Sequence, residues 1–190
     1  MNLLHRWYCR SDRWAGAIRS KLVPWVLSDT SLGDDVLEIG PGPGITTEVI
    51  RGRAPRMTLL EIDPWSVRAL HAKYGGNSGV EIVQGDATRM PFEDGRFSTA
   101  VCLTMFHHVP SAEQQDALLA EACRVLRPGG VFLGSDSTAS LRFRLYHLFD
   151  TCVPVDPDRL GERLERAGFA DPKVSTARGS FRFRARRGSS

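Results

Sequence analysis

The stretch that decides the fold is VLEIGPGPGITTEVI, residues 36–50. Gly40, Gly42 and Gly44 lie between an apolar run, which predicts a strand, and a segment that predicts a helix. Glycine permits positive φ and has no Cβ to keep a ligand away from the backbone. The helix that follows offers free N–H groups and the positive end of its dipole. The stretch therefore predicts a backbone loop that is shaped around a ligand.

Strands and helices alternate along the rest of the chain. Apolar runs predict strands over residues 35–39, 57–62, 80–84, 97–103, 131–135, 173–176 and 180–184. Periodic patterns predict helices over residues 45–51, 64–74, 111–126 and 158–167, with one or two more before the first strand. Because the central strands are apolar without alternation, we expect a parallel sheet that is covered on both faces. Right-handed crossovers then give a doubly wound α/β sheet.

The composition indicates a globular protein of one domain. The chain has 190 residues, 42% hydrophobic and 25% charged, with a net charge of +3. We expect residues 1–34 to form an N-terminal helical cap and residues 35–190 to form the main domain. The basic C-terminal run FRFRARRGSS is interpreted as a solvated edge strand and tail, so no nucleic-acid partner is expected.

The cysteines and the hydropathy of the chain indicate the cellular compartment. The four cysteines form no CxxC pair, which argues against a zinc site and a disulfide scaffold. No stretch resembles a signal peptide, and no run approaches the roughly 18 apolar residues of a membrane helix. We therefore expect a cytoplasmic protein that does not associate with membranes.

Acidic residues mark the ends of two successive strands. Glu61 ends the second strand in LLEID, where an acid accepts hydrogen bonds from both ribose hydroxyls. Asp86 follows the third strand in GDATRMPF, where it can accept from an adenine amino group. Glu38 lies within the apolar first strand, and a carboxylate there is costly unless it is paired. A cationic ligand group would pair with it, directly or through water.

The spacing of the glycines discriminates between cofactors. The dinucleotide fingerprint is GxGxxG, whereas this loop reads GxGxG and carries no Lys or Arg to meet a pyrophosphate. A ligand with a ribose, an adenine and a cationic amino acid, but no phosphate, fits better. Two alternatives stay open, a nucleotide-dependent oxidoreductase and a cofactor-binding protein without catalytic activity.

Several motifs in order resemble the class I S-adenosylmethionine-dependent methyltransferases. The motifs are VLEIGPGPG, LLEID, GDATRMPFEDGRFSTAV, LTMFHHVPS and EACRVLRPGGVFL, and AGFADPKV with FRFRARR resembles the terminal hairpin. The resemblance is to the small-molecule branch related to the quinone-biosynthesis methyltransferases (methyltransferase-11-like). It implies a Rossmann-like sheet of seven strands in the order 3-2-1-4-5-7-6, mostly parallel with strand seven antiparallel, and helices on both faces.

The resemblance also implies S-adenosyl-L-methionine as cofactor and a role for each matching residue. The glycines would let the backbone approach the methionine and ribose portions, and Glu38 would help to hold the amino group. Glu61 would hold the ribose, and Ile62 would pack on the adenine. The remaining implied contacts are Asp86 and Ala87 around the adenine, and Thr104 at the methionine part or the transferring methyl.

Methyl transfer from a sulfonium is an in-line displacement with a good leaving group. Much of the catalysis can therefore come from holding the nucleophile close and dry. A base is needed only if the acceptor must lose a proton. The candidates are His107 and His108 after the fourth strand, with His147 a weaker one. A structural role for the pair, such as capping a loop or packing on Phe106, is the alternative. No metal is implied, because LTMFHH supplies no carboxylate.

The acceptor site must come from the variable parts of the chain. Their aromatic side chains favour an apolar or aromatic small molecule, although helix-to-sheet packing is the better explanation for at least half of them. These side chains are Trp7, Tyr8, Trp14, Trp25, Phe143, Tyr146, His147 and Phe149. Because the cap is short, two alternatives stay open: a shallow site that accepts a larger or protein-bound substrate, and a homo-oligomer in which a second subunit completes the site.

Overall fold

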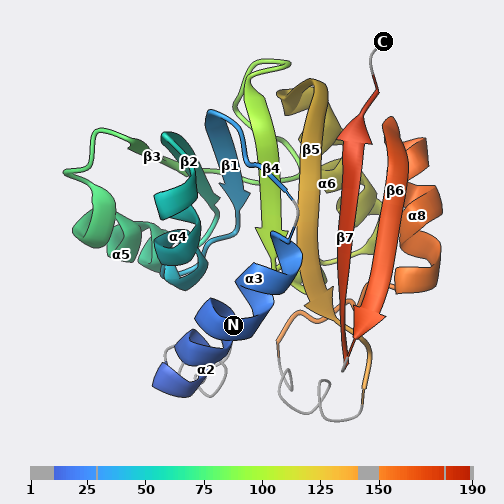
Figure 1. Ribbon diagram of the computed structural model, residues 1–190, viewed down its shortest axis with the longest axis horizontal. Helices are drawn as coiled ribbons and strands as arrows, with labels where there is room; N and C mark the ends of the chain where they lie inside the picture. The colour runs from blue at the N-terminus through green and yellow to red at the C-terminus, as the bar shows by residue number, and fades with distance from the viewer. Residues whose placement is uncertain (1–10, 29, 141–149, 178, 189–190) are drawn as a thin grey trace.

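The computed structural model describes residues 11–28, 30–140, 150–177 and 179–188. They form a seven-stranded sheet in the order β3-β2-β1-β4-β5-β7-β6 (Figure 1). The strands are β1 (Asp35–Ile39), β2 (Arg56–Glu61), β3 (Val80–Gln84), β4 (Phe97–Leu103), β5 (Leu126–Ser137), β6 (Phe169–Ala177) and β7 (Ser180–Arg187). β7 runs antiparallel to both of its neighbours, and the other pairs are parallel. The predicted strand order and direction are confirmed.

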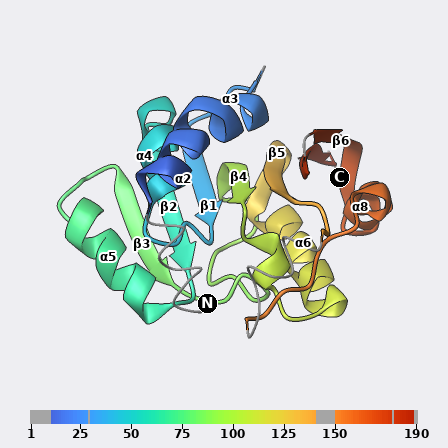
Figure 2. The same ribbon diagram turned by 90° about the horizontal axis from the view of Figure 1, so that it is seen from below.

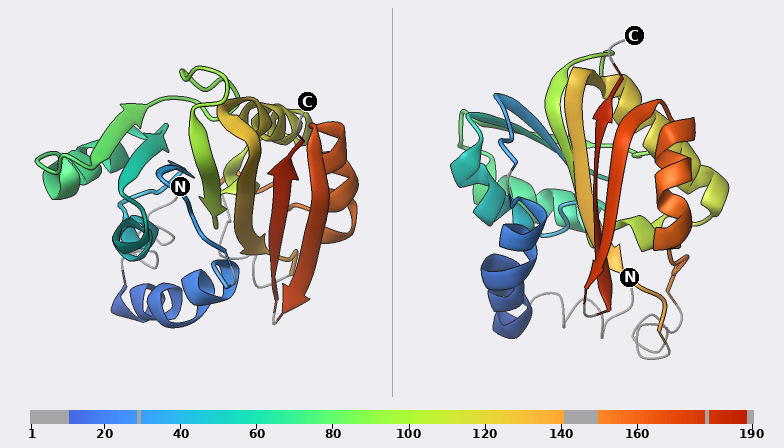
Figure 3. Two further views of the ribbon diagram at one scale, coloured as in Figure 1. Left: turned by 45° about the horizontal axis from the view of Figure 1, so that its top comes forward. Right: turned by 45° about the vertical axis from the view of Figure 1, so that its right-hand side comes forward.

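The helices cover both faces of this sheet. They are α2 (Asp12–Ala17), η1 (Ile18–Leu22), α3 (Val23–Val26), α4 (Ile45–Ile50), η2 (Arg51–Arg53), α5 (Pro64–Tyr74), η3 (Phe106–His108), α6 (Ala112–Val125) and α8 (Pro157–Arg166). Figure 2 shows α3 and α4 on one side of β4 and β5, and α6 on the other. α8 packs along β6 at the edge of the sheet (Figure 3). No helix within the described ranges is long and apolar enough to cross a membrane.

Side-chain caps explain where two of the helices begin. Asp63 accepts from the backbone N–H of Ser66 at 3.0 Å, and Pro64 occupies the first turn of α5. Ser111, predicted as an N-cap, accepts from the N–H of Gln114 at 3.2 Å and starts α6. The predicted bounds of α5 are confirmed, and those of α6 hold to within one residue.

The N-terminal helices join the main core. Ile18, Val23 and Val26 are buried in the same apolar cluster as Val36 of β1 and Leu133 of β5. This packing places the helix before β1 against the sheet. The division of the chain at residue 34 into a cap and a main domain stays a prediction.

β5 and β6 are longer than the sequence pattern indicates. β5 begins at Leu126, directly after α6, and its register with β4 shifts where Gly129 adopts φ +74°. β6 begins at Phe169, and its register with β7 shifts around Asp171, at φ +51°. Such irregularities interrupt the apolar pattern, so the sequence marks them as breaks although pairing continues across them.

Candidate functional site

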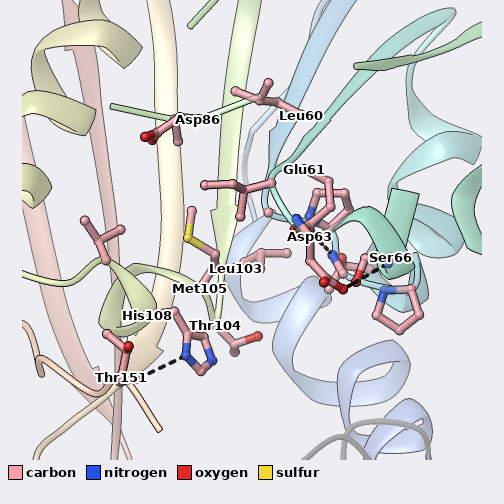
Figure 4. Close-up of a pocket in the computed structure, with 18 of the residues that line it drawn as sticks. Leu60, Glu61, Asp63, Ser66, Asp86, Leu103, Thr104, Met105, His108 and Thr151 are labelled. Carbon is pink, nitrogen blue, oxygen red and sulfur yellow. Dashed lines mark hydrogen bonds between the residues drawn. The ribbon is translucent and has the colours of Figure 1, made fainter. Parts of the chain in front are cut away.

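A pocket of about 410 Å³ lies where the parallel strands end. Its walls come from the loops after β1, β2, β3 and β4, from α2, and from residues 150–151 (Figure 4). This is the edge at which open α/β sheets bind their ligands. Of the residues predicted from the sequence, the pocket is lined by Gly40, Gly42, Glu61, Ile62, Asp86, Ala87, Thr104 and His108, and not by Glu38, Gly44 or His107.

The three loop glycines have different surroundings. All three have positive φ, +65° at Gly40, +56° at Gly42 and +83° at Gly44. A Cβ at Gly42 would meet nothing within 4 Å, so this position faces open space. A Cβ at Gly44 would lie 2.9 Å from the side chains of Leu70 and Tyr74, both in α5. Gly44 therefore lets the loop pack closely on α5, while Gly42 leaves room for a ligand.

Alanine at these two positions should separate the two roles. Both substitutions place Cβ in the left-handed region, which costs about 1–2 kcal/mol. Gly44→Ala also overpacks the contact with α5, so it should lower the free energy of unfolding by about 1 kcal/mol more than Gly42→Ala does. Urea unfolding of the two variants measures this difference. Equal losses would show that the contact between Gly44 and α5 is loose.

Glu61 connects the end of β2 to the glycine loop. Its Oε2 accepts from the N–H of Gly42 at 2.9 Å, and its Oε1 accepts from the N–H of Asp63 at 2.9 Å. The residue is 7% exposed, and burial raises the pKa of its carboxyl. The sequence does not signal the bond to Gly42, because its two partners lie 19 positions apart in the chain. Glu61 thus shapes the loop as well as lining the pocket.

Ile62 and Asp86 line the part of the pocket that lies beyond the ends of β2 and β3. Among the described residues, Ile62 is the one large hydrophobic side chain that is exposed, at 63%. Asp86 follows β3, and its Oδ1 accepts from the N–H and the hydroxyl of Thr88 at 2.8 and 2.9 Å. These bonds hold the carboxylate of Asp86, which lines the pocket (Figure 4). Ala87 lines the same wall.

Glu38 lies behind the glycine loop rather than in the pocket. It is 1% exposed and accepts hydrogen bonds from the hydroxyls of Thr46 and of Thr47, the latter at 2.6 Å. Burial raises the pKa of Glu38 to about 7, against the lowering effect of the two threonine bonds. Because Thr46 also lines the pocket, it connects this buried acid to the space in front of the loop.

The two histidines after β4 are separated by the fold. His108 lines the pocket, with Nδ1 3.3 Å from the carbonyl oxygen of Thr151 (Figure 4). His107 is 3% exposed, and its Nδ1 lies 2.6 Å from Oδ1 of Asp136. Thr104 lines the pocket beside His108, at a φ of +52°. The sequence does not signal this role of Asp136, because a lone acid late in an apolar strand belongs to no motif.

Apolar and polar residues share the rest of the wall, and the polar ones include Gln114, Asp150 and Thr151. The apolar ones include Trp14, Leu103, Met105, Val109 and Pro110. Trp25 is not among the lining residues, and the guanidinium of Arg182 lies 5.3 Å from its ring centre. The other predicted acceptor-side residues, Trp7, Tyr8, Phe143, Tyr146, His147 and Phe149, lie outside the described residues.

Known proteins resemble this chain in sequence and in fold. The model of the methyltransferase domain family matches residues 37–134. The chain is 34% identical over 140 residues to the ubiquinone biosynthesis O-methyltransferase of Azotobacter vinelandii, which is 67% of this chain and 56% of that protein. It is 33% identical over 159 residues, 80% of this chain and 58% of the other, to a Mycolicibacterium smegmatis protein named as a probable S-adenosylmethionine-dependent methyltransferase. This chain thus spans somewhat over half the length of these relatives.

A solved structure agrees with the fold. The N-methyltransferase NodS of Bradyrhizobium japonicum, solved with S-adenosyl-L-homocysteine, superposes with a TM-score of 0.74 at 16% identity. The superposition covers 95% of this chain and 91% of that one, and confirms the predicted class I architecture. Because the region matched by the family model holds the glycine loop and both strand-end acids, this chain belongs to the methyltransferase domain family, whose cofactor is S-adenosylmethionine.

Proposed function

We propose that this chain transfers the methyl group of S-adenosylmethionine to a small, apolar acceptor by in-line displacement without a metal. One observation carries the proposal, namely that the two ends of the pocket differ in chemistry. Backbone N–H groups and carboxylates gather at one end, represented by Gly42, Glu61 and Asp86. Apolar side chains such as Met105 and Val109 line the other, together with the polar residues His108 and Thr151. The first end suits an adenosyl group, and the second suits an acceptor.

The nucleoside end supports a cofactor without phosphate. Glu61 and Asp86 would accept from the ribose hydroxyls and the adenine amino group, and the exposed Ile62 would pack on the adenine ring. Carboxylates at a pocket disfavour a pyrophosphate and favour a cationic ligand. Glu38 would act on the cofactor's ammonium group through Thr46, which lines the pocket and bonds to Glu38.

The other end supports an apolar acceptor. Trp14, Leu103 and Met105 present apolar surface to the pocket, and this surface would keep water from the reacting atoms. The wall would hold the nucleophile in line with the sulfur–methyl bond, which lowers the entropic part of the barrier. The relative from Azotobacter vinelandii is named for the biosynthesis of ubiquinone, which agrees with a small-molecule acceptor.

His108 is the better placed of the two candidate bases. It lines the pocket, whereas His107 is buried against Asp136. It would take a proton from acceptors that must lose one, and would be dispensable for those that need not.

His108→Ala is expected to leave the affinity for S-adenosylhomocysteine within about threefold of the native chain, because the residue lies on the acceptor side. Calorimetric titration measures this affinity. A large loss would show that His108 holds the cofactor instead of facing the acceptor.

The proposed activity is tested with deuterium-labelled S-adenosylmethionine. The chain is incubated with apolar phenols, amines and carboxylic acids of matched size, and the labelled products are identified by mass spectrometry. We expect labelled product from at least one class, and about thirtyfold less with Glu61→Ala at a cofactor concentration well below the dissociation constant. Binding of S-adenosylhomocysteine without any product would favour a non-catalytic role. Binding of NAD in its place would favour an oxidoreductase.

A further inference from the structure

The turn after β4 is held in a strained conformation. Thr104 has φ +52°, in the left-handed region that β-branched residues rarely adopt. Such strain persists only where the surrounding structure holds it. The N–H of Thr104 donates to the carbonyl oxygen of Ser135 in β5 at 2.8 Å. From this turn, Thr104, Met105 and His108 reach the pocket.

Asp136, which follows Ser135 in β5, binds the same turn through His107. It is 1% exposed, and its Oδ2 accepts from the N–H of His107 at 2.9 Å. Its Oδ1 lies 2.6 Å from Nδ1 of His107 and accepts from the N–H of Ser137 at 2.6 Å. A buried carboxylate is tolerated only when donors surround it, and here His107 supplies two of them.

His107 is also held from its other side. Its carbonyl oxygen accepts from the N–H of Val153 at 2.8 Å. Its ring centre lies 4.1 Å from that of His108. His107 itself does not line the pocket, so these contacts act on the site through the backbone and through the neighbouring ring.

We propose that Asp136 and His107 form a buried latch, which holds residues 104–108 in their strained shape against the end of β5. Asp136 is then a positioning residue, because it aims Thr104 and His108 at the pocket without touching it. The carboxylate also selects the tautomer of His107 that carries its proton on Nδ1. The hydrogen bonds of the latch do not depend on the proposed function. Only the role given to them, which is to aim side chains at a methyl-transfer site, rests on it.

Asp136→Asn tests the latch with little change in shape. The asparagine has an NH2 donor where the aspartate has a second acceptor oxygen. If this NH2 takes the place of Oδ1, Nδ1 of His107 must accept instead of donating, and the N–H of Ser137 loses its acceptor. If it takes the place of Oδ2, the N–H of His107 loses its acceptor. We expect nitrogen-15 NMR to show His107 protonated on Nδ1 in the native chain and on Nε2 in the variant, and amide exchange across residues 104–109 to rise at least about fivefold. An unchanged tautomer with exchange rates within about twofold would overturn the latch.

A matched control and two further variants keep the test decisive. Asp94 precedes β4, and its exposed carboxylate bonds to Arg124. Asp94→Asn removes this carboxylate and should leave amide exchange at residues 104–109 within about twofold of the native rates. If Asp136→Asn does not fold, His107→Phe is used instead, because it replaces the imidazole with an aromatic ring that has no nitrogen to bond to Asp136. It should speed the same exchange, and unchanged rates would overturn the latch.

The strain at Thr104 is tested in the Asp136→Asn background. Thr104→Asn should bring the exchange back to within about twofold of the native rate, because asparagine tolerates the left-handed region. Failure to do so would contradict strain as the force that opens the turn. None of these measurements needs an acceptor or a cofactor, so the latch and the proposed activity can fail independently.

Discussion

Replacing Glu38 by glutamine is expected to raise the free energy of unfolding by about 3 kcal/mol at about pH 8.5, and to change it little at about pH 4. The cause is burial, which raises the pKa of Glu38 from 4.5 to about 7 in the folded chain. The folded chain therefore holds this proton more tightly than the unfolded chain does. The resulting stability is fully present below pH 4.5 and is lost as the pH rises through 7. Glutamine stays neutral and shows no such loss.

Urea unfolding of the two proteins across this range measures the effect. The difference between them should grow from about pH 4.5 to about pH 7 and then level off. Glu165→Gln, which alters an exposed glutamate of α8, is the matched control and should follow the native chain. Parallel pH curves for the native chain and Glu38→Gln would show that Glu38 is not a buried, destabilised carboxylate.

Glu61→Ala is expected to weaken the binding of S-adenosylhomocysteine by about 2 kcal/mol, roughly thirtyfold. Two causes combine. The ribose hydroxyls would lose their acceptor, and the N–H of Gly42 would lose the oxygen that holds the loop in shape. Calorimetric titration gives the affinity, and circular dichroism checks that the fold is retained. An affinity within twofold of the native value would contradict the placement of the ribose.

Glu61→Gln is the matched variant for this position. It keeps the side-chain length and one acceptor oxygen, so it can hold either Gly42 or Asp63 but not both. We expect its affinity to fall between those of the native chain and Glu61→Ala. If Glu61→Gln lost as much affinity for S-adenosylhomocysteine as Glu61→Ala does, the charge of Glu61 rather than its hydrogen bonds would account for the loss.

Local patterns in the sequence predicted most of the helices and strands. The apolar run before Gly40, the cap at Ser111 and the glycines after α5 each act within a few residues, and their elements lie where predicted. The extensions of β5 and β6 could not be predicted in this way. Each depends on pairing across an irregular residue, such as Gly129 or Asp171, and this pairing is decided by a distant strand.

Part of the candidate site could be predicted from the sequence, and part of it could not. Glu61 and Asp86 could be predicted at the pocket because a parallel sheet brings all its strand ends to one edge. The separation of His107 from His108 could not, because consecutive residues in a tight turn point in different directions. The partnership of His107 with Asp136 depends on a contact 29 residues apart, which the sequence does not signal. The roles assigned to these residues in binding and catalysis stay proposals.

A crystal of the chain soaked in S-adenosylhomocysteine tests the central claim most directly. The account predicts density across residues 40–44, with both ribose hydroxyls on Glu61, the adenine between Ile62 and Asp86, and the sulfur toward Thr104. A pocket without ligand at saturating concentration, or a ligand bound away from Glu61, would contradict it.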